Sequence, residues 1–186
     1  MYQDFDDPWG QTTEKFATDK AIALNAIMKL GANKVIELGC GLGHFTNKIA
    51  SLGVSVLGID ISTTAINRAK YNYPECHFTV GDILDFSIYD NYCPDMIVMS
   101  EITWYVLDKL DRFIEYLKEY HPLSYMIHIL TVYPSGDQKY GVDKFTNLSE
   151  IMSYYKFRYL EWGEISRLEG GGCKKTYFVG QISQKC

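Results

Sequence analysis

The stretch of sequence that decides the fold is Val35-Ile36-Glu37-Leu38-Gly39-Cys40-Gly41-Leu42-Gly43-His44-Phe45-Thr46. An apolar run ends in a carboxylate, a glycine-rich turn follows, and a helical pattern then begins. This order predicts a buried strand, a tight loop and a helix N-terminus, which is the layout of a nucleotide-binding crevice. Alternating glycines let the backbone approach a ligand in conformations that a side chain would forbid.

The spacing of these glycines argues against a dinucleotide. The fingerprint G-x-G-x-x-G, counted from Gly39, would place its third glycine at position 44, where His44 stands. We therefore expect the loop to serve a nucleoside-like cofactor without a pyrophosphate.

Length and composition predict one globular domain of 186 residues, 47% of them hydrophobic, with a formal net charge of -5. Lysines and arginines are scattered and form no basic face, so we expect no nucleic-acid partner. The acidic N-terminus carries no apolar signal segment, and no run of about 18 apolar residues exists. We expect no membrane insertion, a cytoplasmic location, and a monomer or homodimer.

The cysteines predict neither a disulfide framework nor a metal site. Their number is odd and no pair has the spacing C-x-x-C. This pattern is typical of a protein from a reducing compartment. The five residues are Cys40, Cys76, Cys93, Cys173 and Cys186.

Apolar runs and helical patterns alternate along the chain, which predicts an α/β fold of three layers with a mostly parallel sheet. The segment between Ile83 and Cys93 is short for a helix, so we expect a loop there. The last two strands flank a glycine-rich turn and are expected to pair antiparallel. Strands are predicted at 35–38, 54–60, 77–80, 95–100, 125–132, 158–165 and 176–182, and helices at 13–30, 45–52, 63–71, 107–120 and 148–155.

Three carboxylates come at or just after three successive strands. Asp60 follows Glu37 by 23 residues, and Asp82 follows Asp60 by 22 residues. A carboxylate after the second strand suits two ribose hydroxyls, because it accepts hydrogen bonds from both. Asp82 would accept from an adenine amine, the Ile83 N–H would donate to a ring nitrogen, and Ile61 with Ile83 would sandwich the base. The alternative for Asp60 and Asp82 is a turn or cap role.

Together, the segments 37–43, 58–62 and 81–83 resemble the successive motifs of class I S-adenosylmethionine-dependent methyltransferases. The resemblance covers roughly residues 13–182 and implies a Rossmann-like, seven-stranded sheet with its last strand antiparallel. It implies S-adenosylmethionine as cofactor and S-adenosylhomocysteine as product. Gly39, Cys40 and Gly41 would pass the methionine part, and Glu37 would order the loop. Glu37 as a cap of the loop's own amides is the alternative.

The fourth strand delivers the predicted acceptor segment, Ser100-Glu101-Ile102-Thr103-Trp104-Tyr105. Ser100 is assigned to the cofactor side. Glu101 is the candidate catalytic base, or else a cap of the following helix. Trp104 and Tyr105 are expected to line the acceptor pocket, with packing over the cofactor as the alternative.

His44, beside the glycine loop, is the second catalytic candidate, with a packing role at the helix start as its alternative. Residues 1–12 are expected to form an arm and 13–30 a helix that acts as a lid. Trp9 on that arm, and Tyr133 after the fifth strand, are further candidates for binding the acceptor.

The leading hypothesis is transfer of a methyl group to an oxygen or nitrogen of a small polar acceptor, with a sugar or surface-polysaccharide precursor as first guess. Within the family, the sequence resembles bacterial small-molecule methyltransferases of the nodulation (N-methylating) or sugar and polysaccharide type. The alternatives are a NAD(P)-dependent oxidoreductase and a non-catalytic partner subunit that binds S-adenosylmethionine.

Overall fold

The structure is a computed structural model that describes residues 2, 7, 8, 10, 17–134, 136–166 and 172–182. Trp9 and residues 13–16 lie outside the described residues, so the predictions for them are not addressed. The chain forms two compact units, Met1–Val98 and Met99–Cys186. Within the described part of the chain, no helix is long and apolar enough to cross a membrane.

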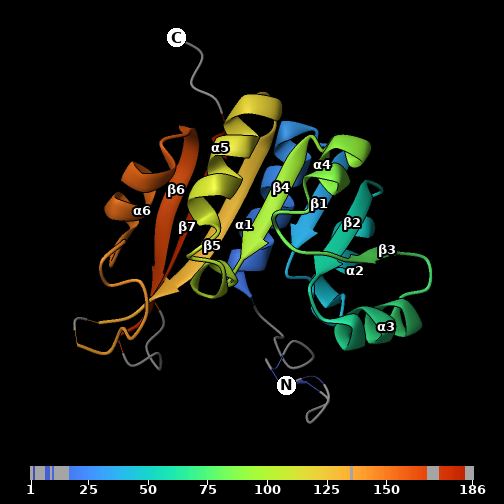
Figure 1. The fold of residues 1–186 in the computed structure, drawn as a ribbon, viewed down its shortest axis with the longest axis horizontal. Helices are drawn as coiled ribbons and strands as arrows, with labels where there is room; N and C mark the ends of the chain where they lie inside the picture. The colour runs from blue at the N-terminus through green and yellow to red at the C-terminus, as the bar shows by residue number, and fades with distance from the viewer. Residues whose placement is uncertain are drawn as a thin grey trace. The chain divides into compact units, whose positions relative to one another are not determined.

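The strands form a seven-stranded sheet in the order β3-β2-β1-β4-β5-β7-β6 (Figure 1). The strand that is last in sequence lies between β5 and β6 and is antiparallel to both. The predicted Rossmann-like α/β fold with an antiparallel last strand is therefore confirmed. The strands are β1 (Lys34–Leu38), β2 (Ser55–Asp60), β3 (His77–Val80), β4 (Met96–Ser100), β5 (Tyr125–Val132), β6 (Arg158–Ser166) and β7 (Lys174–Gln181).

In the first unit, β1, β2 and β3 are parallel neighbours. Leu38 pairs with Ile59, and Asp60 pairs with Val80, so the three strands end at the same edge. The loops that follow them therefore gather at this edge, where open α/β sheets bind ligands. The helices of this unit are α1 (Thr18–Leu30), α2 (His44–Ala50), α3 (Thr63–Asn72) and α4 (Phe86–Tyr92).

Helix α1 begins later than the sequence pattern indicated. Ala17 has an extended backbone and precedes the first helical residue, Thr18, so the prediction of a start at residue 13 is wrong for Ala17. Gly31 ends the helix in the left-handed conformation, with φ at 65°. Ser62 caps α3, because its side chain accepts a hydrogen bond from the Ala65 N–H.

The expectation of a loop between Ile83 and Cys93 is wrong, because this segment contains helix α4. The helix is stabilised by tertiary contacts that a sequence pattern does not reveal. Tyr89 is fully buried, and its hydroxyl donates to the carbonyl of Ile83 at 3.1 Å. Cys93 then ends the helix in a left-handed conformation.

The second unit contains η1 (Thr103–Tyr105), α5 (Leu110–Tyr120), α6 (Leu148–Tyr155) and the strands β5, β6 and β7. The predicted antiparallel pairing of the last two strands is confirmed, with a register shift between Tyr159 and Glu161. Strand β5 pairs with β7 so that His128 lies opposite Phe178.

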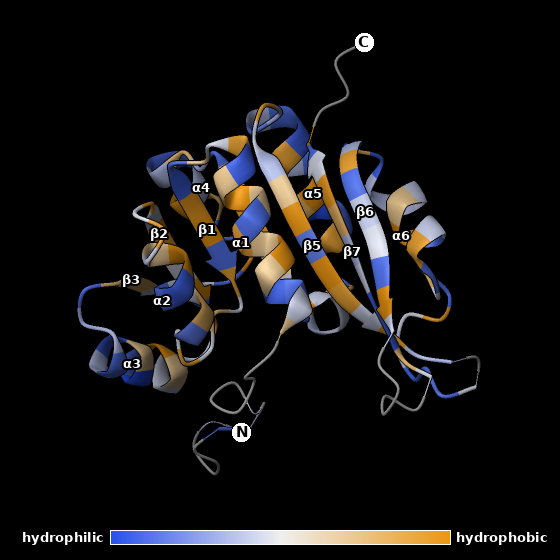
Figure 2. Ribbon diagram, turned by 180° about the vertical axis from the view of Figure 1, so that it is seen from behind, coloured by the Kyte–Doolittle hydropathy of each residue, from blue (hydrophilic) through white to orange (hydrophobic). Residues whose placement is uncertain are grey.

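Strands β5 and β6 differ in polarity, as Figure 2 shows by the mostly orange β5 and the pale β6. Six of the eight residues of β5 are buried, whereas the residues of β6 alternate between exposed and half-buried. Strand β6 is last in the strand order, and its Trp162 side chain is 54% exposed. The core of the second unit therefore lies along β5 and β7.

Candidate functional site

The glycine loop after β1 has the backbone conformation that its sequence predicts. Gly39, Gly41 and Gly43 have φ values of 69°, 54° and 80°. Side chains disfavour this left-handed region, so glycines are needed here. The loop is tied to the sheet by the Cys40 N–H, which donates to the Ile59 carbonyl at 3.0 Å. Its amides are thereby held at the carboxyl edge of β1 and β2.

Asp60 connects the loops that follow all three parallel strands. One carboxylate oxygen accepts from the Gly41 N–H at 2.9 Å, and the other accepts from the Ser62 N–H at 2.8 Å. Its carbonyl accepts from the Gly81 N–H at 3.1 Å. A carboxylate has about four acceptor positions, so the half-buried Asp60 keeps capacity for ligand hydroxyls in addition to these bonds.

Glu37 lies buried beneath the loop. Its carboxylate accepts from the Thr46 hydroxyl at 2.5 Å, which joins the end of β1 to helix α2. Burial raises the pKa of Glu37 from 4.5 to about 7, although the positive charge of Lys20 and the Thr46 hydrogen bond oppose the rise. The structure thus shows Glu37 supporting the loop, and any direct contact with a cofactor stays a prediction.

The Cys40 side chain packs into the hydrophobic core instead of facing a ligand. It forms a cluster with Ile66, Ala69 and Phe78. Burial, together with the nearby carboxylates of Glu37 and Asp60, raises the pKa of the Cys40 thiol well above its usual range. The contribution of Cys40 to cofactor binding is therefore limited to its backbone.

The residues predicted to hold adenine differ in exposure. Ile61, directly after β2, is 69% exposed and offers an apolar surface. The Ile83 side chain is buried, and no acceptor is found for its backbone N–H among the described residues. Asp82 accepts from the Leu84 N–H at 3.0 Å, so the turn role that was left open for it is present.

His44 packs at the start of α2. Its Nδ1 lies 2.5 Å from the Tyr73 hydroxyl, and the two rings meet edge to face. Burial lowers the pKa of His44, with the nearby Asp7 carboxylate opposing this change. These contacts match the packing alternative, and the catalytic role of His44 stays a prediction.

We expect the variant Gly43→Ala to lose about 2 kcal/mol of unfolding free energy. A left-handed alanine accounts for about half of this loss. The rest is steric, because a Cβ atom at Gly43 would lie 2.6 Å from the Phe78 ring. Gly53→Ala is the matched control, since Gly53 has φ at 81° and open space around the added Cβ. Equal losses in the two variants, measured by urea unfolding, would contradict the steric component.

The acceptor segment, residues 100–105, belongs to the second unit and is held by residues of β5. Glu101 has a left-handed backbone with φ at 60°, a conformation that costs a non-glycine residue about 1 kcal/mol. Its carboxylate accepts from both the backbone N–H and the hydroxyl of Thr131, at 3.0 and 2.8 Å. The Nζ atom of Lys175 lies 3.6 Å from the same carboxylate. Glu101 therefore bonds to β5 and not to the helical turn that follows it.

Trp104 is anchored by the same residue, because its indole N–H donates to the Thr131 carbonyl at 3.0 Å. The indole packs against Phe145 with ring centroids 5.4 Å apart. Gly141 lies so close to the indole that an added Cβ would be 2.6 Å from it. These contacts correspond to the packing alternative for Trp104.

Three exposed tyrosines surround this turn. Tyr105, Tyr133 and Tyr140 have exposed fractions of 65%, 44% and 69%. The pKa of Tyr105 is raised chiefly by burial, and the charges of Tyr133, Glu101 and Tyr140 raise it further. Tyr105 and Tyr133 were predicted to bind the acceptor, whereas Tyr140 has no sequence signal beyond its residue type.

Sequence reasoning also missed Thr46, Thr131 and Lys175. Thr131 and Lys175 act on Glu101, which is remote from both in sequence. Thr46 ends the opening stretch, but its hydrogen bond to Glu37 was not predicted. Ser100, assigned to the cofactor side, is buried at the end of β4.

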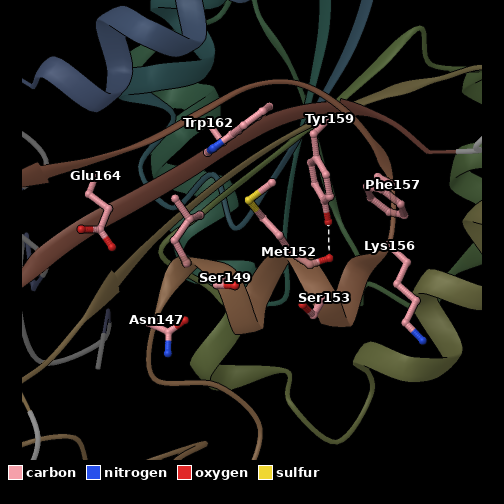
Figure 3. Close-up of a pocket in the computed structure, with 10 residues that line it drawn as sticks. Asn147, Ser149, Met152, Ser153, Lys156, Phe157, Tyr159, Trp162 and Glu164 are labelled. Atoms are coloured by element: carbon pink, nitrogen blue, oxygen red, sulfur yellow. Dashed lines mark hydrogen bonds between the residues drawn. The ribbon is translucent and has the colours of Figure 1, made fainter.

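A groove of about 730 Å³ in the second unit is lined by none of the predicted site residues. It runs between α6 and β6 in the second unit (Figure 3). Trp162 and Tyr159 project into it from β6, and the Tyr159 hydroxyl donates to the Met152 carbonyl on α6 at 2.5 Å. The groove contains no carboxylate or histidine that sequence reasoning had assigned to catalysis.

Comparison with known proteins finds similarity to methyltransferases over part of the chain. Residues 35–120 match the family described as Methyltransferase domain. The putative methyltransferase 235L of Invertebrate iridescent virus 6 is 37% identical over 89 residues, which is 46% of this chain and 33% of that protein. Nodulation protein S of Bradyrhizobium diazoefficiens is 29% identical over 111 residues, covering 57% of this chain and 52% of that protein.

The matched regions are thus shorter than the relatives themselves, since the chain spans only 33% and 52% of these two curated proteins. A solved structure, N-methyltransferase NodS from Bradyrhizobium japonicum, superposes with a TM-score of 0.67. The superposition covers 94% of this chain and 98% of that chain at 19% identity, and at this identity it shows the fold alone.

Proposed function

We propose that this chain transfers a methyl group from S-adenosylmethionine to an oxygen or nitrogen of a small polar acceptor, and the match of residues 35–120 to the methyltransferase domain family supports the proposal. The observation that carries the proposal is the position of Asp60. Its carboxylate joins a glycine loop with left-handed φ values to the turn after β2, and its carbonyl holds the loop after β3.

The residues at the carboxyl edge of β1, β2 and β3 fit S-adenosylmethionine chemically. Asp60 retains acceptor positions for the two ribose hydroxyls. The exposed Ile61 offers an apolar face to adenine, and the Ile83 N–H offers a donor to a ring nitrogen. The amides of Gly39 and Gly41 would hold the methionine part, with Glu37 supporting them from below.

The second unit supplies the groups for the acceptor. S-adenosylmethionine, when bound, supplies a methyl carbon on a sulfonium that is already a good leaving group, so positioning the nucleophile accounts for much of the rate. Glu101 would accept the proton that the acceptor loses. Tyr105 and Tyr133 would bind the acceptor, with Trp104 packed beneath them.

A sugar or polysaccharide precursor is the acceptor class that we favour. The exposed rings of Tyr105, Tyr133 and Tyr140 beside a carboxylate combine flat apolar surfaces with hydrogen-bonding groups, which suits a pyranose ring. The fold relative NodS is an N-methyltransferase, which supports testing amino sugars first.

The direct test has two steps. Calorimetric titration with S-adenosylmethionine and with NAD separates a methyltransferase from an oxidoreductase, and we expect binding of the former alone. The protein is then incubated with methyl-labelled S-adenosylmethionine and a panel of amino sugars and neutral sugars. Transfer of label to a sugar supports the proposal. Cofactor binding with no transfer to any acceptor class would favour a non-catalytic subunit.

We expect Glu101→Gln to lower turnover by about 10- to 100-fold while leaving the affinity for S-adenosylmethionine unchanged. Glutamine keeps an oxygen that accepts from the Thr131 N–H but does not act as a base. Steady-state kinetics and calorimetry measure the two quantities separately.

Thr131→Val is the control for the structural part of this effect. It removes the hydroxyl that donates to Glu101 and leaves the carboxylate charge in place. We expect a much smaller loss of turnover than in Glu101→Gln. A loss of the same size in both variants would mean that Glu101 acts only by fastening the turn to β5.

A further inference from the structure

A buried histidine on β5 is the starting point for a role that the methyl-transfer proposal does not use. His128 and Thr103 are both completely buried, and the His128 Nε2 lies 2.8 Å from the Thr103 hydroxyl. The imidazole stacks on Phe178 with ring centroids 5.0 Å apart and an interplanar angle of 15°. Tyr155 packs against it at 4.8 Å. The ring is therefore fixed by aromatic neighbours, and it bonds to the residue that begins η1.

The Thr103 hydroxyl links His128 to a second buried residue. Burial raises the pKa of the Tyr155 phenol, and a hydrogen bond with Thr103 opposes this rise. The Tyr155 hydroxyl is in turn the donor to the Met99 sulfur, at 3.8 Å. These contacts connect the buried imidazole to the end of β4 through Thr103 and Tyr155.

The surroundings of Nδ1 assign the tautomer of His128, in which Nε2 carries the proton and donates to the Thr103 hydroxyl. With the proton on Nε2, the Nδ1 atom carries a lone pair and no proton. Nδ1 is buried and has no hydrogen-bond partner among the described residues. An N–H without an acceptor would be left there in the other tautomer, and the assigned tautomer avoids that cost.

His128 is neutral at physiological pH. Complete burial lowers its pKa to about 3. The groups that face the ring are Thr103 on η1, Tyr155 on α6 and Phe178 on β7, and none of these is a carboxylate or a cation. A proton-carrying role is therefore excluded near pH 7, and a geometric role is left.

The element that this histidine holds is weak by itself. A single turn of 3₁₀-helix has poor hydrogen-bond geometry, and η1 has three residues with no side-chain cap. It follows the left-handed Glu101. Tertiary bonds therefore decide its position, and they come from β5: Thr131 bonds to Glu101 and Trp104 on one side, and His128 bonds to Thr103 from the interior.

We propose that His128 is a positioning residue that sets the orientation of the turn carrying Glu101, Trp104 and Tyr105, through its hydrogen bond to Thr103. The functional consequence rests on the proposed methyl transfer, whereas the geometric consequence does not. Three residues of β5 fasten the turn. Ile129 accepts from the Glu101 N–H at 2.9 Å, Thr131 bonds to Glu101 and Trp104, and His128 bonds to Thr103. Without the bond from His128, the turn stays fastened at Glu101 and Trp104 but is no longer fixed at the start of η1, which allows its orientation to change.

Three variants separate positioning from stability. His128→Gln keeps a donor near the Nε2 position. His128→Phe keeps the ring packing and leaves the Thr103 oxygen without its donor. The double variant His128→Phe/Thr103→Val makes both partners apolar, which removes the unpaired group and restores stability. We expect the urea midpoint to fall in His128→Phe and to return to near the wild-type value in the double variant.

The readout of position is the indole N–H of Trp104, observed in a nitrogen-proton correlation spectrum and assigned with Trp104→Phe. We expect its hydrogen exchange to be about tenfold faster in His128→Phe and in the double variant, and unchanged in His128→Gln. With a methylated acceptor in hand, kcat should fall by about tenfold in the same two variants, with a smaller change in KM.

A purely structural role for His128 predicts that the double variant recovers both the wild-type urea midpoint and the wild-type exchange rate of the Trp104 indole N–H. Recovery of both quantities would therefore overturn the proposal. Wild-type exchange in His128→Phe would overturn it as well. If no acceptor is methylated by the wild-type protein, the proposed function fails, and the exchange measurement still decides the role of His128.

Discussion

Replacing Asp60 with alanine is expected to weaken the binding of S-adenosylmethionine by about 3 kcal/mol, more than 100-fold in the dissociation constant. The substitution removes the charged acceptor proposed for the ribose hydroxyls. It also removes the acceptor of the Gly41 and Ser62 amides, which lie at 2.9 and 2.8 Å, so the glycine loop loses a support. Calorimetric titration of the folded variant measures the change.

Asp95→Ala provides a matched control for the loss of support. Asp95 also accepts from two backbone amides, those of Asn33 and Lys34, at 2.8 and 2.9 Å. Asp95 directly precedes β4 and bonds to the beginning of β1, the end of that strand opposite the glycine loop. We expect Asp95→Ala to destabilise the fold while cofactor affinity is retained. Unchanged affinity in Asp60→Ala, or an equal loss in both variants, would remove Asp60 from the ribose site.

Stability should depend on the protonation of Glu37. The ordinary pKa of a glutamate side chain is 4.5, and the pKa of Glu37 in the folded protein is about 7. Between these two pH values the unfolded chain has released the proton while the folded chain keeps it, so the unfolding free energy falls as pH rises. The fall is complete above the folded pKa and amounts to about 3 kcal/mol at most.

Glu37→Gln isolates this effect, because glutamine does not titrate and still accepts from the Thr46 hydroxyl. The difference in unfolding free energy, wild type minus variant, should be largest near pH 4.5 and should drop by about 3 kcal/mol by pH 8. Urea unfolding across this range measures it. Parallel pH profiles for the two proteins would show that the pKa of Glu37 is the same in the folded and the unfolded chain.

The succession of strands and helices along the chain could be predicted from the sequence, and so could the loops that follow the strands. These features follow from local causes: apolar runs make buried strands, and glycines occupy left-handed positions such as φ 80° at Gly43. Asp60 could be predicted as a site residue because a carboxylate at the carboxyl end of a strand has few functions, namely binding of ribose hydroxyls or a turn or cap role. The antiparallel pairing of β6 with β7 was likewise predictable from the turn between them.

The parts that escaped prediction depend on partners remote in sequence. Thr131 bonds to Glu101 across 30 residues, and the pattern around Thr131 reads as an ordinary buried strand. Helix α4 depends on the burial of Tyr89, which local propensity does not encode. Cys40 belongs to the glycine motif, yet its side chain is committed to the core by the packing of α3 and β3. Tertiary packing decided each of these cases.

The residues that hold the acceptor turn are different from the side chains that the turn and its neighbours expose. This difference has an evolutionary consequence. Thr131 and His128 hold the turn from within, while Tyr105, Tyr133 and Tyr140 extend toward solvent. Substitutions at the three tyrosines thus carry little folding penalty, and the scaffold tolerates drift toward new acceptors. A library randomised at these three positions should be rich in folded variants, and it is the natural starting point for directed evolution of acceptor preference.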